Sequence, residues 1–239
     1  MIAINNFLSE YIDGQRDFKR GKVILAYGNE KAMEANTRSY RGYNLNRLFT
    51  EEYLNSGSKE YAIQRAIDLS EIMDEADYLL DIHSTSGPTV PFIFSENRER
   101  NLEIVSNLGI PHVIIGWNEV AGDVLAGDTE TYMNSLGKPG FTLEAGSHLD
   151  SGAADIAYEV LHNYLAHLKI IKKKTRKDPP SIQKVSMYKV ITTASGVFQF
   201  EKKFPNFHPI QKGDLIGYEG KEKNPLLAEE DFIMLLPNM

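Results

Sequence analysis

The chain has no cysteine among its 239 residues. Disulfides, thiolate zinc sites and cysteine nucleophiles are therefore excluded, and any metal must be bound by histidine, aspartate or glutamate. No apolar run is long enough to span a bilayer. The first eight residues also lack the basic segment and the small-residue cleavage site of a secretion signal. We therefore expect a cytoplasmic protein that has no membrane partner.

A strong positive charge is also absent. The formal net charge of -7 is spread along the chain and provides no electrostatic footprint for nucleic acid. The one dense basic cluster, residues 172–177, follows a helical pattern and is interpreted as a solvated linker. A hydrophobic content of 42% with 25% charged residues is ordinary for a folded protein of this length. We expect a globular protein that has no nucleic-acid partner.

Helical and strand periodicities alternate along the first three quarters of the chain. This alternation predicts an α/β domain at residues 1–178, with a mainly parallel or mixed sheet covered by helices on both faces. The expected helices lie at residues 4–12, 58–76, 100–108 and 150–171, and the expected strands at residues 22–27, 78–83, 91–94, 112–116 and 141–145.

The composition changes after the pair Pro179-Pro180. From there to the end, short β-type runs are punctuated by glycine and proline, and helical periodicity is weak. We expect a small all-β domain at residues 184–239.

The first candidate site residues are Asp81 and His83, which lie at the end of an apolar run that is too short for a helix. Side chains two residues apart on a strand point the same way, so the pair could be a metal ligand and its orienting carboxylate. Glu144 ends another apolar strand. In parallel sheets ligands bind beyond the carboxyl ends of the strands, where His83 and Glu144 both fall. The alternative is that His83 only caps a core strand.

A polar stretch upstream adds Arg38, Asn46 and Arg47. Together with His83 and Glu144, these guanidinium and amide groups are the functional groups needed to hydrolyse an amide in a substrate that carries carboxylates. The alternative is a polar loop held by surface hydrogen bonds.

These motifs resemble, in order and spacing, the succinylglutamate desuccinylase and aspartoacylase family of zinc-dependent hydrolases, which share the carboxypeptidase A fold. Glu30 stands where the family has proline, and Asn44 where it has aspartate. The resemblance rests on residues 28–32 (Asn-Pro-x-Ala in the family), 36–38 (Thr-Arg), 44–47 (Asp-Leu-Asn-Arg), 81–83 (Asp-Leu-His), 143–146 (a strand end with glutamate) and 212–217 (the C-terminal β domain).

The resemblance implies a zinc-dependent deacylase that cleaves the amide of a small anionic N-acyl amino acid or related carboxylate. His83 would be a ligand of one Zn²⁺ ion, with Asp81 behind it. Glu144 would move a proton from the zinc-bound water to the leaving nitrogen. Arg38 would polarise the scissile carbonyl, and together with Asn46 and Arg47 would bind the substrate.

The family's other two zinc ligands come from a His-x-x-Glu motif that precedes its first helix, and this chain has no such motif. The resemblance therefore implies that these ligands lie upstream of Met1, in a chain shortened at its N-terminus. We expect the other histidines to have surface or packing roles, His148 alone being near Glu144 in sequence: His112, His148, His162, His167 and His208.

Two other functions remain open from the sequence. One is a catalytically incompetent protein that uses the same arginines and amide to bind an anion. The other is a metallocarboxypeptidase that acts on peptides. The sequence is compatible with a homo-oligomer.

Overall fold

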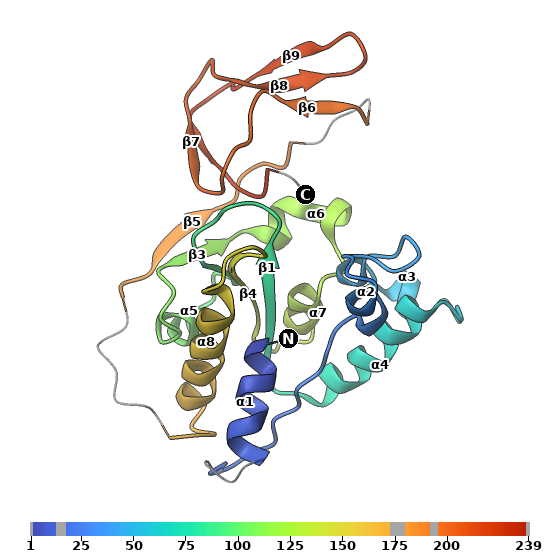
Figure 1. The fold of residues 1–239 in the computed structure, drawn as a ribbon, viewed down its shortest axis with the longest axis vertical. Helices are drawn as coiled ribbons and strands as arrows, with labels where there is room; N and C mark the ends of the chain where they lie inside the picture. Colours follow the sequence, from blue (N-terminus) through green and yellow to red (C-terminus); the bar gives the residue numbers. More distant parts are fainter. Residues whose placement is uncertain (1, 13–17, 173–179, 192–195, 238–239) are drawn as a thin grey trace.

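The central element of the structure, a computed structural model, is a five-stranded sheet with the order β1-β4-β2-β3-β5 (Figure 1). The structure describes residues 2–12, 18–172, 180–191 and 196–237. Three strand pairs, β1–β4, β2–β3 and β3–β5, are parallel, and β2–β4 is antiparallel. The sheet is therefore mixed and mainly parallel, as expected. Its strands are β1 (Leu79–Thr85), β2 (Phe92–Phe94), β3 (His112–Ile115), β4 (Gly140–Ser147) and β5 (Gln183–Ser186).

One face of the sheet is covered by α8 (Ala153–His167) and α5 (Glu99–Ser106), and α1 (Ile2–Ile12) packs against α8. Alternate residues of β4 point to this face, because side chains two apart on a strand share a side. The contact is fully apolar and forms the main core. Its members include Phe141, Leu143 and Ala145 of β4 and Ala153, Ala157, Val160 and Tyr164 of α8.

The opposite face is covered by α7 (Thr129–Ser135), which packs on β4 and β1, with α4 (Tyr61–Glu75) beside it. The approach of α7 requires glycine at position 140, because a Cβ atom there would lie 2.8 Å from the Cβ of Met133. The sheet thus has helices on both faces. The remaining helices are α2 (Glu30–Glu34), a 3₁₀ helix (Leu45–Arg47), α3 (Glu51–Leu54) and α6 (Trp117–Leu125, broken at Gly122).

The expected strand at residues 22–27 is wrong, because no strand forms there. Val23 and Leu25 pack against the cluster that contains Phe7, so their apolar character is satisfied by side-chain contacts. The nearby carbonyl oxygens of Tyr27 and Gly28 accept hydrogen bonds from the guanidinium of Arg65 instead of from a neighbouring strand. The other expected helices and strands are confirmed with shifts at their ends. The sequence did not predict α2, the 3₁₀ helix, α3, α6 or α7.

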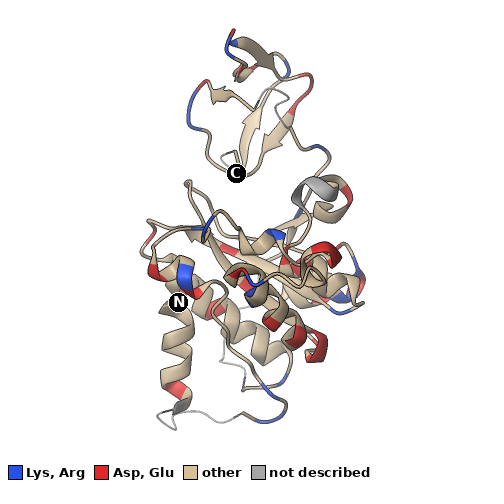
Figure 2. Ribbon diagram, turned by 90° about the vertical axis from the view of Figure 1, so that its right-hand side faces the viewer, with Lys and Arg blue, Asp and Glu red and all other residues tan. Residues whose placement is uncertain are grey.

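Five short strands follow the main sheet. β6 (Phe198–Phe200), β8 (Leu215–Glu219) and β9 (Asn224–Leu227) form an antiparallel sheet, and β7 (His208–Ile210) pairs with β10 (Phe232–Met234). They surround their own apolar core and lie above the α/β part in both ribbon views (Figures 1 and 2). The expected domain boundary at residue 184 falls within β5, which pairs with β3 in the main sheet.

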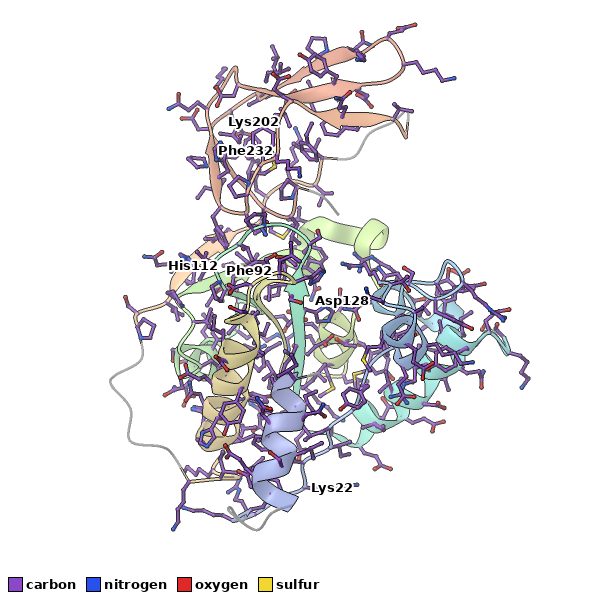
Figure 3. All side chains as sticks on the ribbon, in the orientation of Figure 1. Lys22, Phe92, His112, Asp128, Lys202 and Phe232 are labelled. Carbon is purple, nitrogen blue, oxygen red and sulfur yellow. The ribbon has the colours of Figure 1, made fainter. Side chains whose placement is uncertain are left out.

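The β part contacts the end of the main sheet through Phe207. Its ring lies with its centroid 5.4 Å from that of Phe92 and 4.9 Å from that of His112, both of which Figure 3 labels. The amide of Asn206 also donates a hydrogen bond of 3.3 Å to the carbonyl of Pro88. These contacts place the β part over the carboxyl end of β1. Within the described ranges, no helix is long and apolar enough to cross a bilayer.

A matched pair of leucines tests the core assigned to β4. Leu143 is 0% exposed and Leu149 is 93% exposed. We expect Leu143→Ala to lower the free energy of unfolding by about 2–5 kcal/mol, because it removes buried methyl groups and leaves a cavity. Leu149→Ala should change it by less than about 0.5 kcal/mol. Urea denaturation measures both, and equal effects would contradict the assignment.

Candidate active site

The site is built on the in-register pairing of β1 and β4. Asp81 pairs with Thr142, and His83 pairs with Glu144. Because Phe141, Leu143 and Ala145 face α8, the alternate residues Thr142 and Glu144 face the side of α7. Their partners Asp81 and His83 point the same way, since paired residues of neighbouring strands share a face. Two carboxylates and an imidazole therefore lie on the same face of the sheet, near the carboxyl end of β1.

Asp81 and His83 form a half-buried ion pair. Nε2 of His83 lies 2.9 Å from Oδ2 of Asp81, and the hydroxyl of Thr129 donates a hydrogen bond of 2.6 Å to the same oxygen. Burial acts to lower the pKa of His83, but the charge and the hydrogen bond of Asp81 outweigh it and raise that pKa to about 9. Burial likewise acts to raise the pKa of Asp81, and His83 reverses this and lowers it.

The 3₁₀ helix brings the side chain of Asn46 to this ion pair. The side chain of Asn44 accepts a hydrogen bond of 3.3 Å from the amide of Asn46, and Leu45 is buried beneath. Nδ2 of Asn46 then lies 3.2 Å from Nε2 of His83. The segment is also fixed by Gly127, where an added Cβ would lie 2.7 Å from the carbonyl carbon of Arg47. Asn44, which stands where the family has aspartate, therefore still caps the N-terminus of the 3₁₀ helix.

Two arginines face the same cavity. Arg38 and Arg47 both line it, and burial is the main factor that lowers the pKa of Arg47, with a further contribution from the charge of Arg38. Asp128 acts in the opposite sense and raises that pKa. Asp128 itself lies at the start of α7, in the position labelled in Figure 3. The two guanidinium groups form a positive wall that suits a carboxylate.

Glu144 has an unusual environment for a carboxylate. Its Oε2 atom is buried and has no hydrogen-bond partner among the described residues. Burial raises the pKa of Glu144, and the charge of Asp81 adds to this effect, whereas His83 and Arg38 oppose it. A buried acceptor without a partner is costly to maintain, and such atoms are found where a ligand or a water binds.

These side chains line one cavity of about 90 Å³. The sequence-predicted residues Arg38, Asn46, Arg47, His83 and Glu144 all border it, and the β part closes one side. The residues contributed by that part are Phe204, Asn206, Leu236 and Pro237. The structure therefore brings together side chains from residues far apart in the sequence, and their catalytic roles stay predictions.

Sequence reasoning missed two acids and a tryptophan that also line the cavity. Asp128, Glu130 and Trp117 line it, and Trp117 donates a hydrogen bond of 3.0 Å from its indole nitrogen to Oδ2 of Asp128. Asp128 also caps α7, accepting a hydrogen bond of 2.7 Å from the amide of Thr131. A capping aspartate and an acidic first turn are ordinary at helix starts, so the sequence carries no signal that these acids face a cavity.

The other histidines do not add a set of metal ligands. His148 lies close enough to Arg38 and His83 for their charges to act on it, and its Nδ1 lies 2.7 Å from the hydroxyl oxygen of Ser84. Burial lowers its pKa, as do the charges of Arg38 and His83. His208 packs against Phe204, with ring centroids 5.4 Å apart. Within the described parts of the chain, no three histidine, aspartate or glutamate side chains converge as a metal site would require.

The family model of the succinylglutamate desuccinylase/aspartoacylase catalytic domain matches residues 1–168. The chain belongs to this family. Its members are desuccinylase and aspartoacylase hydrolases, and the matched segment includes every residue singled out above except those of the β part. No curated protein sequence gives a significant match.

Solved structures of this family share the fold at low identity. Succinylglutamate desuccinylase from Vibrio cholerae has a TM-score of 0.75 and 16% identity over 96% of this chain and 69% of its own. The corresponding protein from Vibrio parahaemolyticus has a TM-score of 0.73 and 17% identity over 96% and 70%. The product-bound ectoine utilization protein EutE (DoeB) from Ruegeria pomeroyi has a TM-score of 0.66 and 20% identity over 89% and 68%. The chain thus spans about two thirds of their length.

The substitution Glu130→Gln tests whether the environment of Glu130 raises the pKa of its carboxyl group. Burial raises its pKa well above 4.5, and the charge of Asp128 is the next cause. Because the folded state holds this proton more tightly than the unfolded state, stability falls as pH rises from the unfolded value towards the folded one. Glutamine does not titrate, so we expect Glu130→Gln to raise the Tm at pH 7 by roughly 2–4 °C, the shift for about 1 kcal/mol.

At pH 4 most of the advantage of Glu130→Gln should disappear, since the wild-type carboxyl is then mostly protonated in both states. Thermal unfolding followed by circular dichroism at the two pH values measures this. Glu103→Gln, at an exposed position of α5, is the matched control and should change little at either pH. A variant that is less stable at pH 7 than at pH 4, relative to wild type, would contradict the assignment.

Proposed function

We propose that this chain forms the catalytic part of a zinc-dependent deacylase that cleaves the amide bond of a small N-acyl amino acid or related carboxylate. One observation carries the proposal: Oε2 of Glu144, which has no hydrogen-bond partner among the described residues, and the imidazole of His83 come from paired positions of neighbouring strands and border a cavity that two arginines also border. Relatives whose names denote desuccinylases support the same class of reaction.

Substrate binding is assigned to Arg47, Asn46 and Arg38. A guanidinium group can bind a carboxylate through two parallel hydrogen bonds, which fixes its orientation as well as its charge. The amide of Asn46 adds a neutral donor beside them. With the carboxylate held there, the scissile carbonyl would lie towards His83 and Glu144, and Arg38 would stabilise the negative charge that develops on its oxygen.

Proton transfer is assigned to Glu144. Its raised pKa improves its match to the task of general base, because a base is most effective when its pKa approaches the working pH. In the first step the carboxylate takes a proton from water as the water oxygen attacks the carbonyl carbon. In the second step the carbon–nitrogen bond breaks and the same proton passes to the leaving nitrogen. The products are a carboxylic acid and an amine, which ionise near neutral pH to a carboxylate and an ammonium ion.

Zinc binding is assigned in part to His83. Its Nε2 atom contacts Asp81 and Asn46, which leaves Nδ1 for a metal in a carboxylate–histidine–metal arrangement. The described residues do not complete a zinc site by themselves, so the proposal places the other two ligands outside them. A bound zinc ion lowers the pKa of a coordinated water to about 7. The steps above use the residues of this chain alone.

The size of the cavity favours a small substrate over a peptide. About 90 Å³ is well below the roughly 300–1,000 Å³ of sites that enclose drug-sized molecules. The β part narrows the cavity further, since Leu236 and Pro237 stand on its border. An extended peptide chain would need an open cleft on this side.

Glu144→Gln tests the proposed chemistry. We expect kcat for N-acyl amino acids to fall by at least about 10²-fold, because the amide of glutamine cannot accept the proton. The KM and the circular dichroism spectrum should stay close to those of wild type. Glu103→Gln is again the control. Turnover that survives in a clean Glu144→Gln preparation would exclude the proton-transfer role, and wild-type binding without any turnover would favour the anion-binding alternative.

His83→Ala tests the metal assignment independently of activity. We expect protein expressed from the complete reading frame to contain about one zinc ion per chain, the stoichiometry of a mononuclear catalytic site. His83→Ala should lose most of it, as measured by mass spectrometry of the metal after dialysis. His167→Ala, in the last turn of α8, is the control and should keep its zinc. Full zinc retention in His83→Ala would show that His83 is not a ligand.

A further inference from the structure

Thr129 is a buried polar residue that the proposed chemistry does not use. It is the first residue of α7 and is 8% exposed, and it is not among the residues that border the cavity. Its hydroxyl donates a hydrogen bond of 2.6 Å to Oδ2 of Asp81, a length typical of a hydroxyl that donates to a charged carboxylate. The hydroxyl therefore acts on Asp81 and has no direct access to a bound ligand.

Two donors from different elements meet at the same oxygen of Asp81. Oδ2 lies 2.6 Å from the hydroxyl oxygen of Thr129, on α7, and 2.9 Å from Nε2 of His83, on β1. The last torsion of an aspartate side chain has broad energy wells, so contact with His83 alone leaves the carboxylate free to rotate. A second donor, fixed on another element, narrows that rotation and holds Oδ2 towards the imidazole.

The helix that carries Thr129 is held at both of its ends. Just before α7, the carbonyl of Gly127 accepts a hydrogen bond of 3.1 Å from the amide of Phe49. Near its last turn, the side-chain oxygen of Asn134 accepts a hydrogen bond of 3.2 Å from the amide of Gly140, where β4 begins. Threonine is also branched at Cβ, which restricts its side-chain rotamers. The hydroxyl of Thr129 is therefore held in place relative to β1.

The contact between Thr129 and Asp81 bears on the ring of His83. Because Nε2 of His83 contacts Asp81, the direction of the carboxylate sets the direction in which Nδ1 points. Groups that orient a metal-binding histidine through its second nitrogen typically change metal affinity by about 10- to 100-fold when they are lost. A residue that orients such a carboxylate acts one step further from the metal, through the same ring.

We propose that Thr129 is a positioning residue for the zinc site: its hydroxyl holds the carboxylate of Asp81, which holds the ring of His83 with Nδ1 available to the metal. This inference rests on the proposed function, in which His83 binds zinc. It assigns the hydroxyl of Thr129 a role that its methyl group and its place in α7 do not share. Exchange of the hydroxyl for a methyl group therefore separates this role from packing.

The test is a measurement of zinc affinity on protein expressed from the complete reading frame. Competition with a chromophoric chelator gives the Kd for zinc. Thr129→Val replaces the hydroxyl with a methyl group of similar size, and we expect it to weaken zinc binding by about 10- to 100-fold. Thr129→Ser keeps the hydroxyl, so its Kd should stay within about threefold of the wild-type value because the hydrogen bond is retained.

Thr131→Val is the matched control, because it removes a hydroxyl from the same turn of α7. That hydroxyl donates hydrogen bonds of 2.7 Å to Asn118 and 2.9 Å to Asp128 instead of to Asp81. We expect Thr131→Val to lower the Tm about as much as Thr129→Val does, since each substitution removes hydrogen bonds of a part-buried hydroxyl. Its Kd for zinc should stay unchanged.

A double-mutant cycle with Asp81→Ala tests whether Thr129 acts through Asp81. Without the carboxylate the hydroxyl has nothing to hold, so adding Thr129→Val to Asp81→Ala should change the Kd by less than about twofold. A general loosening of α7 would instead weaken zinc binding by the same factor in both backgrounds. The comparison of Thr129→Val with Thr129→Ser decides the question independently if Asp81→Ala does not fold.

The results that would overturn the inference differ in what else they remove. If Thr129→Val binds zinc as tightly as wild type, or if Thr129→Ser binds it as weakly as Thr129→Val, the role of the hydroxyl is wrong and the deacylase proposal stands. Equal losses with and without the Asp81 carboxylate would also reject the role. If the wild-type protein binds no zinc, the metal assignment of the proposed function fails together with the inference.

Discussion

The pairing of β1 with β4 is the constraint on which the site depends. Parallel strands in register place Asp81 beside Thr142 and His83 beside Glu144. The alternation of the strands then sends the apolar residues of β4 to α8 and its polar residues to α7. A slip of one residue would turn Glu144 into the core and expose Leu143. Packing of Phe141, Leu143 and Ala145 against α8 thus fixes the direction of the groups proposed for catalysis.

The sequence predicted the sheet and the position of the site for physical reasons that are local. Asp81, His83 and Glu144 stand at the ends of apolar runs, and such ends meet at one edge of a parallel sheet. The strand predicted at residues 22–27 is wrong because a pattern of apolar residues indicates which side chains are buried. It does not indicate whether a neighbouring strand is present to pair with. Glu130 and Asp128 were missed because an acid in the first turn of a helix looks the same whether it faces water or a cavity.

The ionisable groups of the site differ in the charges that surround them. Asp81 and His83 stabilise each other's charged forms despite burial, whereas the charges that act on Glu130 are those of Asp128 and other acids. Desolvation acts on all three, so the difference between them comes from the neighbours alone. The same cavity therefore holds an ion pair and an acid whose neutral form is favoured. The attraction between Asp81 and His83 offsets part of the cost of removing their charges from water, whereas Glu130 avoids that cost by holding its proton.

The border of the cavity also bears on how the protein is made. Its side chains range from Arg38 near the start of the described structure to Pro237 at its end. During synthesis the N-terminal part leaves the ribosome first and begins to fold first. A nascent chain that has completed its five-stranded sheet still lacks the wall formed by Phe204, Asn206, Leu236 and Pro237. Until those residues emerge, the acids of the site stay in contact with water, and the cavity is completed only after Leu236 and Pro237 have been made.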